Sequence, residues 1–260
     1  MKIESLYIYP VKSFPAIEIK SSKFDKDGMQ YDRNFIMYDS RGEMQTRRNC
    51  EGMAGFKMNI EDDHLILESL RTRDHISIPF KSDTKRAKSL IIWDRVEQGF
   101  SNPGLVNQFL SEHFEKKVEL YSIKKTRSGY SAFHDASPFL VCNRSSVRFL
   151  EIKTGKEIDI MRFRPNIILD SKTEFDEKNW KKINIDEQPF HAVKLSGRCI
   201  IINQDPLTSV KDLNLLKLIK PYTYENFSIK FGLYIRPELP GLIAAGSSFE
   251  ITGQAIDQTY

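Results

Sequence analysis

The first hundred residues alternate apolar and polar positions in short runs that turn residues separate. An alternation of period two predicts β-strands, because successive side chains of a strand point to opposite faces. On this pattern we expect strands over residues 2–9, 17–21, 34–39, 56–60, 65–67, 76–80 and 90–93. Many short strands at such spacing are typical of a barrel or a sandwich.

The spacing becomes helical at about residue 105. Apolar positions recur at intervals of one helical turn over residues 105–114, behind the start signal Asn102-Pro103-Gly104, which predicts a helix with one buried face. The basic, small-residue stretch 124–129 is typical of a linker or loop. We therefore expect a second module to begin after it.

The second module shows the same mixture of strands and helices. A buried strand is expected over residues 138–142, followed by a helix that Asn143 caps. The remaining expected elements are strands at 166–169 and 200–203, a helix at 210–219 ending before Pro221, and a β pair around Pro240-Gly241. The fold class is therefore mainly β with a few helices (α+β), in two modules.

Composition places the chain among ordinary globular proteins. Hydrophobic residues make up 40% and charged residues 28% of its 260 residues, which disfavours disorder. No apolar run approaches the roughly 20 residues of a membrane helix, and the N-terminus lacks the pattern of a signal peptide. We therefore expect a cytoplasmic protein. The net charge of +4 suits an anionic ligand but is small for a nucleic-acid-binding protein.

The three cysteines, Cys50, Cys142 and Cys199, are far apart and odd in number. This disfavours a disulfide framework, a structural zinc site and an iron–sulfur cluster within this chain. Cys199 begins an isoleucine run, where a free cysteine is usually a small buried hydrophobe. Against this, Gly197 permits close approach of a bulky ligand, and Arg198 favours the thiolate that ligates metals. The residues alone leave both interpretations open.

Two further segments carry charged side chains. If the backbone is extended, Arg162 and Arg164 point the same way, and with Asn166 they suit a phosphate-bearing ligand; ion pairs with nearby carboxylates are the alternative. His134-Asp135 has no second histidine at a ligand spacing, which disfavours zinc. The chain also lacks the GxSxG motif of serine hydrolases.

In their order along the chain, these segments resemble the two-domain MOSC family, in particular the mitochondrial amidoxime-reducing component and its bacterial relatives. The motifs are Tyr9-Pro10-Val11-Lys12-Ser13, Gly28-x-x-x-Asp32-Arg33, Thr46-x-Arg48, Asp135-x-Ser137-Pro138, Phe163-Arg164-Pro165-Asn166 and Arg198-Cys199-x-x-x-x-x-Asp205-Pro206. With the closing Phe231-Gly232-x-Tyr234 they cover nearly the whole chain.

The resemblance implies an N-terminal β-barrel over residues 1–123, packed on a β-rich MOSC domain over residues 124–260. It also implies a molybdenum–molybdopterin cofactor between them, with Cys199 as the metal ligand. Cys199 and Asp135 are then the catalytic residues, and Asp135 needs a raised pKa to donate a proton; orienting the substrate is its other role. The cofactor-binding residues implied by motif position are Lys12, Arg33, Ser137, Arg164, Asn166 and Arg198.

The implied reaction reduces an N-hydroxylated small molecule to the amine and water, as chemistry supplied by the cofactor. Electrons then come from a separate protein of the flavin reductase, ferredoxin or cytochrome type, and no membrane partner is expected. A MOSC protein can instead carry the cofactor or sulfur without reducing anything; the first module, with Lys12 and Arg33, favours the reductase.

A third interpretation is a β-barrel module that binds nucleic acid or protein, and the small net charge disfavours nucleic acid. Its basis is a basic loop with nearby aromatic residues that could stack on bases. The residues concerned are Lys124, Lys125, Arg127, Tyr121, Tyr130 and Phe133.

Overall fold

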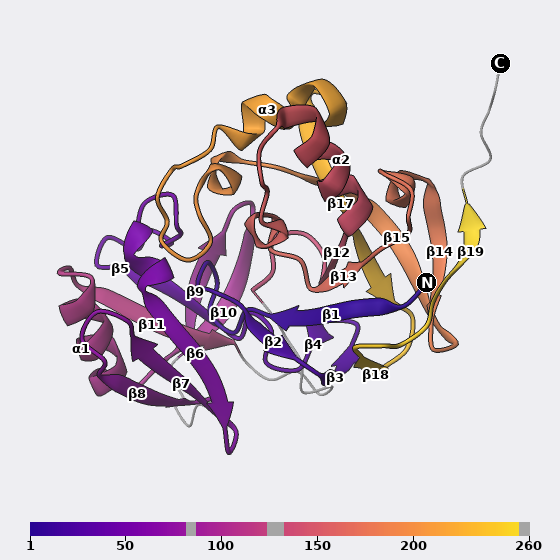
Figure 1. The fold of residues 1–260 in the computed structure, drawn as a ribbon. Helices are drawn as coiled ribbons and strands as arrows, with labels where there is room; N and C mark the ends of the chain where they lie inside the picture. The colour runs from indigo at the N-terminus through magenta and orange to yellow at the C-terminus, as the bar shows by residue number, and fades with distance from the viewer. Residues whose placement is uncertain (82–86, 124–132, 255–260) are drawn as a thin grey trace.

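The computed structural model describes residues 1–81, 87–123 and 133–254. In these residues β-strands dominate and three α-helices lie on the outside of the sheets (Figure 1). The mainly β fold class with few helices is confirmed. The 124–129 linker and the junction at residue 123/124 fall at a stretch, 124–132, that lies outside the described residues, so both stay predictions.

The largest sheet has nine strands and takes most of its strands from the second half of the chain (Figure 1). Its order is β19 (Phe249–Gln254), β14 (Trp180–Ile185), β15 (Gln188–Gly197), β17 (Ser228–Pro237), β12 (Phe139–Asn143), β13 (Ile167–Leu169), β1 (Ile3–Ile8) and β2 (Ile17–Ile19), with β16 (Tyr224–Glu225) paired to β17. Because β1 pairs antiparallel with β13, the first strand of the chain completes the sheet of the second half.

Three smaller sheets hold most of the first half. One is β5 (Phe35–Asp39), β11 (Val118–Ile123), β10 (Arg95–Ser101) and β9 (Ala87–Ile92); the second is β18 (Gly241–Ala244), β3 (Ser21–Asp25) and β4 (Gly28–Met29); the third is β6 (Phe56–Glu61), β7 (His64–Ser69) and β8 (His75–Pro79). The strands that alternation predicts in the first hundred residues are all present, with ends shifted by a few residues.

The helices follow the predicted pattern in two cases of three. α1 (Gly104–His113) lies where the helical spacing places it. α2 (Arg144–Thr154) begins at Asn143, whose side chain accepts a hydrogen bond from the Ser145 amide at 3.2 Å, so the predicted cap is confirmed. Short 3-10 helices occur at η1 (Glu51–Gly55), η2 (Ile160–Phe163), η3 (Asp176–Asn179) and η4 (Ile200–Asn203).

Three predictions for the second half are wrong. Residues 200–203 form η4 rather than a strand, because this turn buries Ile202 while Ile200 stays exposed. α3 is Leu215–Thr223 and contains Pro221; burial of the apolar face of the helix outweighs the hydrogen bond that a proline cannot donate. The strands on either side of Pro240-Gly241 do not pair with each other, since β18 pairs with β3 instead.

Two large hydrophobic cores meet between the halves. One lies on the nine-stranded sheet and the other under the first-half sheets, and Ile17, Tyr31 and Ile60 pack against both. The two halves of the chain are therefore packed against each other through these shared residues. Among the described residues, no helix is long and apolar enough to cross a membrane.

Candidate functional site

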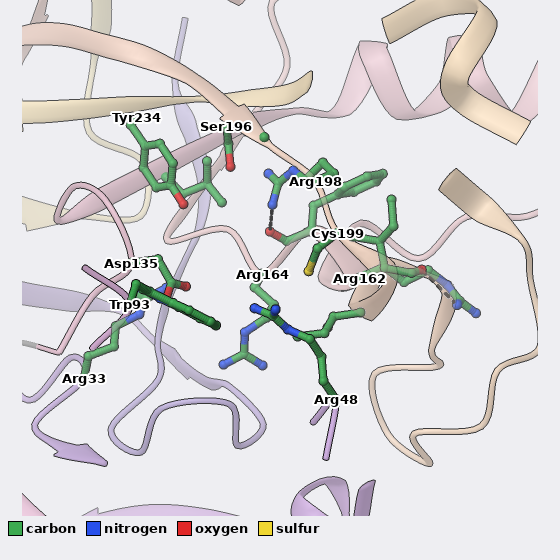
Figure 2. A pocket seen from close by; sticks show the side chains of 15 residues that line it. Arg33, Arg48, Trp93, Asp135, Arg162, Arg164, Ser196, Arg198, Cys199 and Tyr234 are labelled. Atoms are coloured by element: carbon green, nitrogen blue, oxygen red, sulfur yellow. Dashed lines mark hydrogen bonds between the residues drawn. The ribbon is translucent and has the colours of Figure 1, made fainter. Parts of the chain in front are cut away.

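A cavity of about 280 Å³ opens where segments of both halves meet (Figure 2). It is lined by Arg33, Arg48, Trp93, Asp135, Leu140, Arg162, Phe163, Arg164, Ser196, Gly197, Arg198, Cys199, Ile201, Ile202 and Tyr234. A chamber of about 60 Å³ shares Arg33, Asp135, Arg164 and Ile201 with it and adds Lys12, Ser13 and Arg47. The combined space is strongly cationic, with Asp135 as the only carboxylate in its described lining.

Cys199 is the exposed thiol among the three cysteines. Arg198 separates it from the end of β15, and η4 begins directly after it. Its sulfur points into the open centre of the cavity (Figure 2). The buried-hydrophobe interpretation is therefore wrong for Cys199. It holds for Cys50 and Cys142, which are both buried; burial raises the pKa of the Cys142 thiol to about 12.

Arg198 fixes the segment that carries this thiol. Its guanidinium donates to the carbonyl oxygen of Phe231 at 2.9 and 2.5 Å and to that of Phe163 at 2.9 Å. A Cβ added at Gly197 would lie 3.2 Å from Ser228 Oγ, so the small size of this glycine serves the contact between β15 and β17. Arg198 thus keeps a positive charge beside Cys199 while its hydrogen bonds hold the backbone.

Arg162 and Arg164 have different surroundings, because the segment between them is not extended. η2 ends at Arg164, whose backbone is left-handed with φ of 54°. Arg162 donates to both carboxylate oxygens of Asp212, at 2.9 and 2.5 Å. The guanidinium of Arg164 lies 4.3 Å from the centre of the Tyr9 ring and makes no hydrogen bond to a described residue. The ion-pair interpretation fits Arg162, and only Arg164 is free to bind an anion.

Burial lowers the pKa of Arg164 to about 10, and the side chain remains cationic at neutral pH. Arg164 is half-buried and lines both spaces, so its guanidinium faces them without an acceptor among the described residues. An anionic ligand oxygen in the cavity would supply that acceptor.

Asp32 and Asn166 hold Arg33 from behind. Arg33 Nη1 donates to Asn166 Oδ1 at 3.0 Å and to the Asp32 carboxylate. The Asn166 amide also donates to Tyr7 O at 3.1 Å and to Asp32 Oδ2 at 3.2 Å, and its oxygen accepts from the Leu140 amide. Asn166 is buried and does not line either space, so here it positions Arg33.

Lys12 in the chamber and Trp93 in the cavity both donate to Asp135, which lines the two spaces. Lys12 Nζ donates to Asp135 Oδ1 at 2.6 Å and to Phe133 O at 2.9 Å. Trp93 Nε1 donates to the same Asp135 oxygen at 2.7 Å. Desolvation favours a raised pKa for Asp135, but the Lys12 charge and these two hydrogen bonds outweigh it and hold the pKa well below its usual range. The raised pKa predicted for Asp135 is therefore wrong.

The structure places the predicted residues in two layers. Arg33, Asp135, Arg164, Arg198 and Cys199 line the cavity, and Lys12 lines the chamber. Ser137, like Asn166, lies behind the wall, where its hydroxyl donates to Ile235 O at 3.2 Å. Their contact with a cofactor stays a prediction.

Three residues that line these spaces were not predicted as site residues from the sequence: Arg47, Arg48 and Trp93. Thr46-x-Arg48 was a signal for Arg48, since it is one of the motifs. No local pattern marks Trp93, because a tryptophan at the end of a predicted strand looks like core.

The described residues also bear on a metal site built from several protein ligands and on the stacking of bases on aromatic side chains. The residues that the structure describes contain no group of three or more His, Cys, Asp or Glu that could hold a metal ion. Tyr121 and Phe133 are buried at 2% and 0% exposure, so neither can stack on a base. The other residues of the nucleic-acid interpretation are Lys124, Lys125, Arg127 and Tyr130. They fall within 124–132, outside the described residues.

Comparison with known proteins gives a consistent family. Residues 1–117 match the MOSC N-terminal beta barrel domain, and residues 129–250 match the MOSC domain. The chain is 26% identical to mitochondrial amidoxime-reducing component 1 of Mus musculus, over 97% of this chain and 82% of that protein.

A second kind of relative is as similar. The chain is 27% identical to the molybdenum cofactor sulfurase of Drosophila persimilis, over 88% of this chain but only 32% of the sulfurase. The chain thus spans about a third of that protein. Among solved structures, the YuaD protein from Bacillus subtilis aligns with 95% of this chain and 93% of its own, at 12% identity and a TM-score of 0.43.

Proposed function

The chain belongs to the MOSC family in its two-domain form, and we propose that its cavity binds a molybdenum cofactor and that the protein reduces N-hydroxylated compounds. One observation carries the proposal: the exposed thiol of Cys199 shares a cavity with the guanidinium of Arg164, which has no acceptor among the described residues. A ligand that combines a soft metal with an anionic group would bind the thiol through the metal and the guanidinium through the anionic group.

The residues present fit such a cofactor. Its anionic end would be held by cations around the chamber, where Lys12, Arg33, Arg47 and Arg164 converge. Of these, Arg47 uses its guanidinium on Ser209 Oγ and Asp205 O and has no carboxylate partner among the described residues. Cys199 would supply the thiolate ligand, and Arg198 would hold the backbone segment that carries it.

The cofactor, when bound, supplies the two-electron chemistry by which N–OH, two electrons and two protons give N–H and water. The chain's own residues would bind the cofactor and orient the substrate. Because the pKa of Asp135 is depressed, its carboxylate is ionised at neutral pH and can accept a hydrogen bond from the substrate. We assign Asp135 an orienting role rather than that of proton donor. The electrons would come from a separate donor protein of the type predicted above.

A cofactor or sulfur carrier is the second candidate. The similarity to molybdenum cofactor sulfurase favours it, since that match covers 88% of this chain and so includes both domains. The presence of the first module, with Lys12 and Arg33, therefore does not separate the two functions. Only turnover separates them.

The test measures molybdenum and pterin content of protein from a cofactor-competent host, and then reduction of benzamidoxime with an artificial electron donor. We expect near-stoichiometric molybdenum and turnover in the wild type. Cys199→Ser should lose turnover and most of the metal, while Cys50→Ser, a buried thiol away from the cavity, should keep both. Bound cofactor without turnover would favour the carrier, and no metal or pterin in the wild type would refute the proposal.

A further inference from the structure

Trp93 occupies an unusual backbone position for its side chain. Residues 93 and 94 form the tip of the β9–β10 hairpin, in which Arg95 pairs with Ile92. The φ of Trp93 is 58°, a left-handed conformation that favours Gly, Asn or Asp in two-residue hairpins. For a bulky residue this conformation is unfavourable, because Cβ approaches the backbone carbonyl oxygen. A tryptophan kept at a strained tip, rather than in a core, points to a role for its side chain.

The indole is aimed at the cavity, not at the hydrophobic core. It is 44% exposed, lines the cavity opposite Cys199 (Figure 2), and is held by the hydrogen bond from Nε1 to Asp135. The guanidinium of Arg48 lies over the ring, 4.5 Å from its centre. Because the ring is partly exposed and lines the cavity, part of its surface is open to a ligand beside Arg48.

Trp93 lies on the open side of the site. The four cations that suit an anionic end line the narrow chamber, whereas Trp93 and Arg48 line only the wide cavity. A small molecule approaching Cys199 from solvent would therefore pass beside the indole. Offset stacking on this ring, next to a cation, favours a planar and electron-rich group.

We propose that Trp93 is the platform on which the planar part of the substrate stacks, so that the site prefers aryl over aliphatic N-hydroxylated compounds. This inference rests on the proposed reductase function. Asp135, fixed between Lys12 and Trp93, lies at the edge of the platform and is placed to accept a hydrogen bond from the amine side of an amidoxime.

The kinetic test compares benzamidoxime with acetamidoxime in Trp93→Leu, Trp93→Phe and the wild type. Loss of the aromatic contact should raise the KM for benzamidoxime about 3- to 10-fold in Trp93→Leu, with little change for acetamidoxime. Trp93→Phe keeps a ring and should retain most of the preference. Ile91→Ala is the matched control, since Ile91 lies on the same hairpin, is 66% exposed and does not line the cavity.

A second measurement needs no turnover. The chain has two tryptophans, and Trp180 is buried at 1% exposure, so Trp180→Phe leaves Trp93 as the only tryptophan. Benzamidoxime should quench its fluorescence in a saturable way, and acetamidoxime should not. Equal kinetic effects on both substrates, absence of quenching, or loss of pterin from Trp93→Leu would overturn the inference. A wild type that holds cofactor but reduces neither substrate would instead refute the reductase function. In that case the quenching measurement would still show whether the aryl compound binds at Trp93.

Discussion

The hydrogen bonds around Asp32 connect the two halves of the site, and removing the charge of Asp32 tests this connection. The carboxylate is 1% exposed and accepts from the Tyr9 amide at 2.7 Å, from Asn166 Nδ2 at 3.2 Å and from the Arg33 guanidinium. Tyr9 and Arg33 belong to the first half and Asn166 to the second. Asp32→Asn keeps the shape of the side chain but leaves Arg33 without a balancing charge.

The expected cost follows from burial. The Arg33 side chain is only 14% exposed, so water cannot compensate for the lost partner. Breaking one side of a buried ion pair costs about 3–5 kcal/mol, and hydrogen bonds to a charged group contribute about 1.5–3 kcal/mol each without adding fully. We therefore expect the free energy of unfolding to fall by about 3–5 kcal/mol, a large part of the 5–15 kcal/mol typical of a folded protein.

The assay is urea unfolding, followed by circular dichroism and by tryptophan fluorescence. A double-mutant cycle with Arg33→Gln measures the coupling between the two side chains, which we expect to be about 2 kcal/mol. Glu4→Gln is the matched control, because its partner Arg144 is 40% exposed on the surface and such pairs contribute about 0–1 kcal/mol.

The reasoning would be refuted if Asp32→Asn cost no more than Glu4→Gln. Additivity of the Asp32 and Arg33 substitutions would refute it equally. In either case Arg33 would be held by Asn166 and Tyr9, and the ion pair would contribute little.

Three further substitutions test local contacts of individual residues. The folded-state pKa of Asp135 is lowered, so the stability of its ionised carboxylate beside Lys12 is present above the unfolded pKa of about 3.9 and is lost on the acidic side as pH falls below that value. Across pH 5–8 the kcat/KM profile of Asp135→Asn should thus keep the wild-type shape; an acidic limb that the substitution removes would make Asp135 a proton donor after all. Gly232→Ala should lower the free energy of unfolding by more than about 2 kcal/mol, measured in urea, since φ there is 76° and a Cβ would lie 2.7 Å from Val141 O; an unchanged midpoint would contradict this. Asn143→Ala should cost at least about 1–2 kcal/mol, because the buried side chain caps α2 and also donates to Ser171 Oγ and Thr173 O, both at 2.8 Å; an unchanged thermal melt would contradict this.

Most strands of the first half could be predicted from the sequence. The alternation of apolar and polar side chains over a few consecutive residues shows which face of a strand is buried. The same holds for α1 and for the cap at Asn143, which depend on neighbours in the chain. The ordered motifs also identified the family that both domain matches support, and they pointed to Cys199, Arg164 and Lys12 as residues of interest.

Local pattern failed where burial by distant segments decided the conformation. The isoleucine run after Cys199 has strand-forming residues, yet it forms η4. α3 contains Pro221 because tertiary burial of its apolar face outweighs one lost hydrogen bond. The first strand joins the sheet of the second half, a pairing that no local period specifies.

The properties of the site were decided by the tertiary structure alone. Whether Cys199 is buried or exposed, and which of Arg162 and Arg164 has a carboxylate partner, depends on residues brought together by the fold. Lys12 and Asp135 are 123 positions apart, yet their contact reverses the expected direction of the Asp135 pKa. A sequence shows which side chains can ionise or ligate. Only the packed structure fixes how far each is withdrawn from water and which charges face it, and these two quantities set the chemistry.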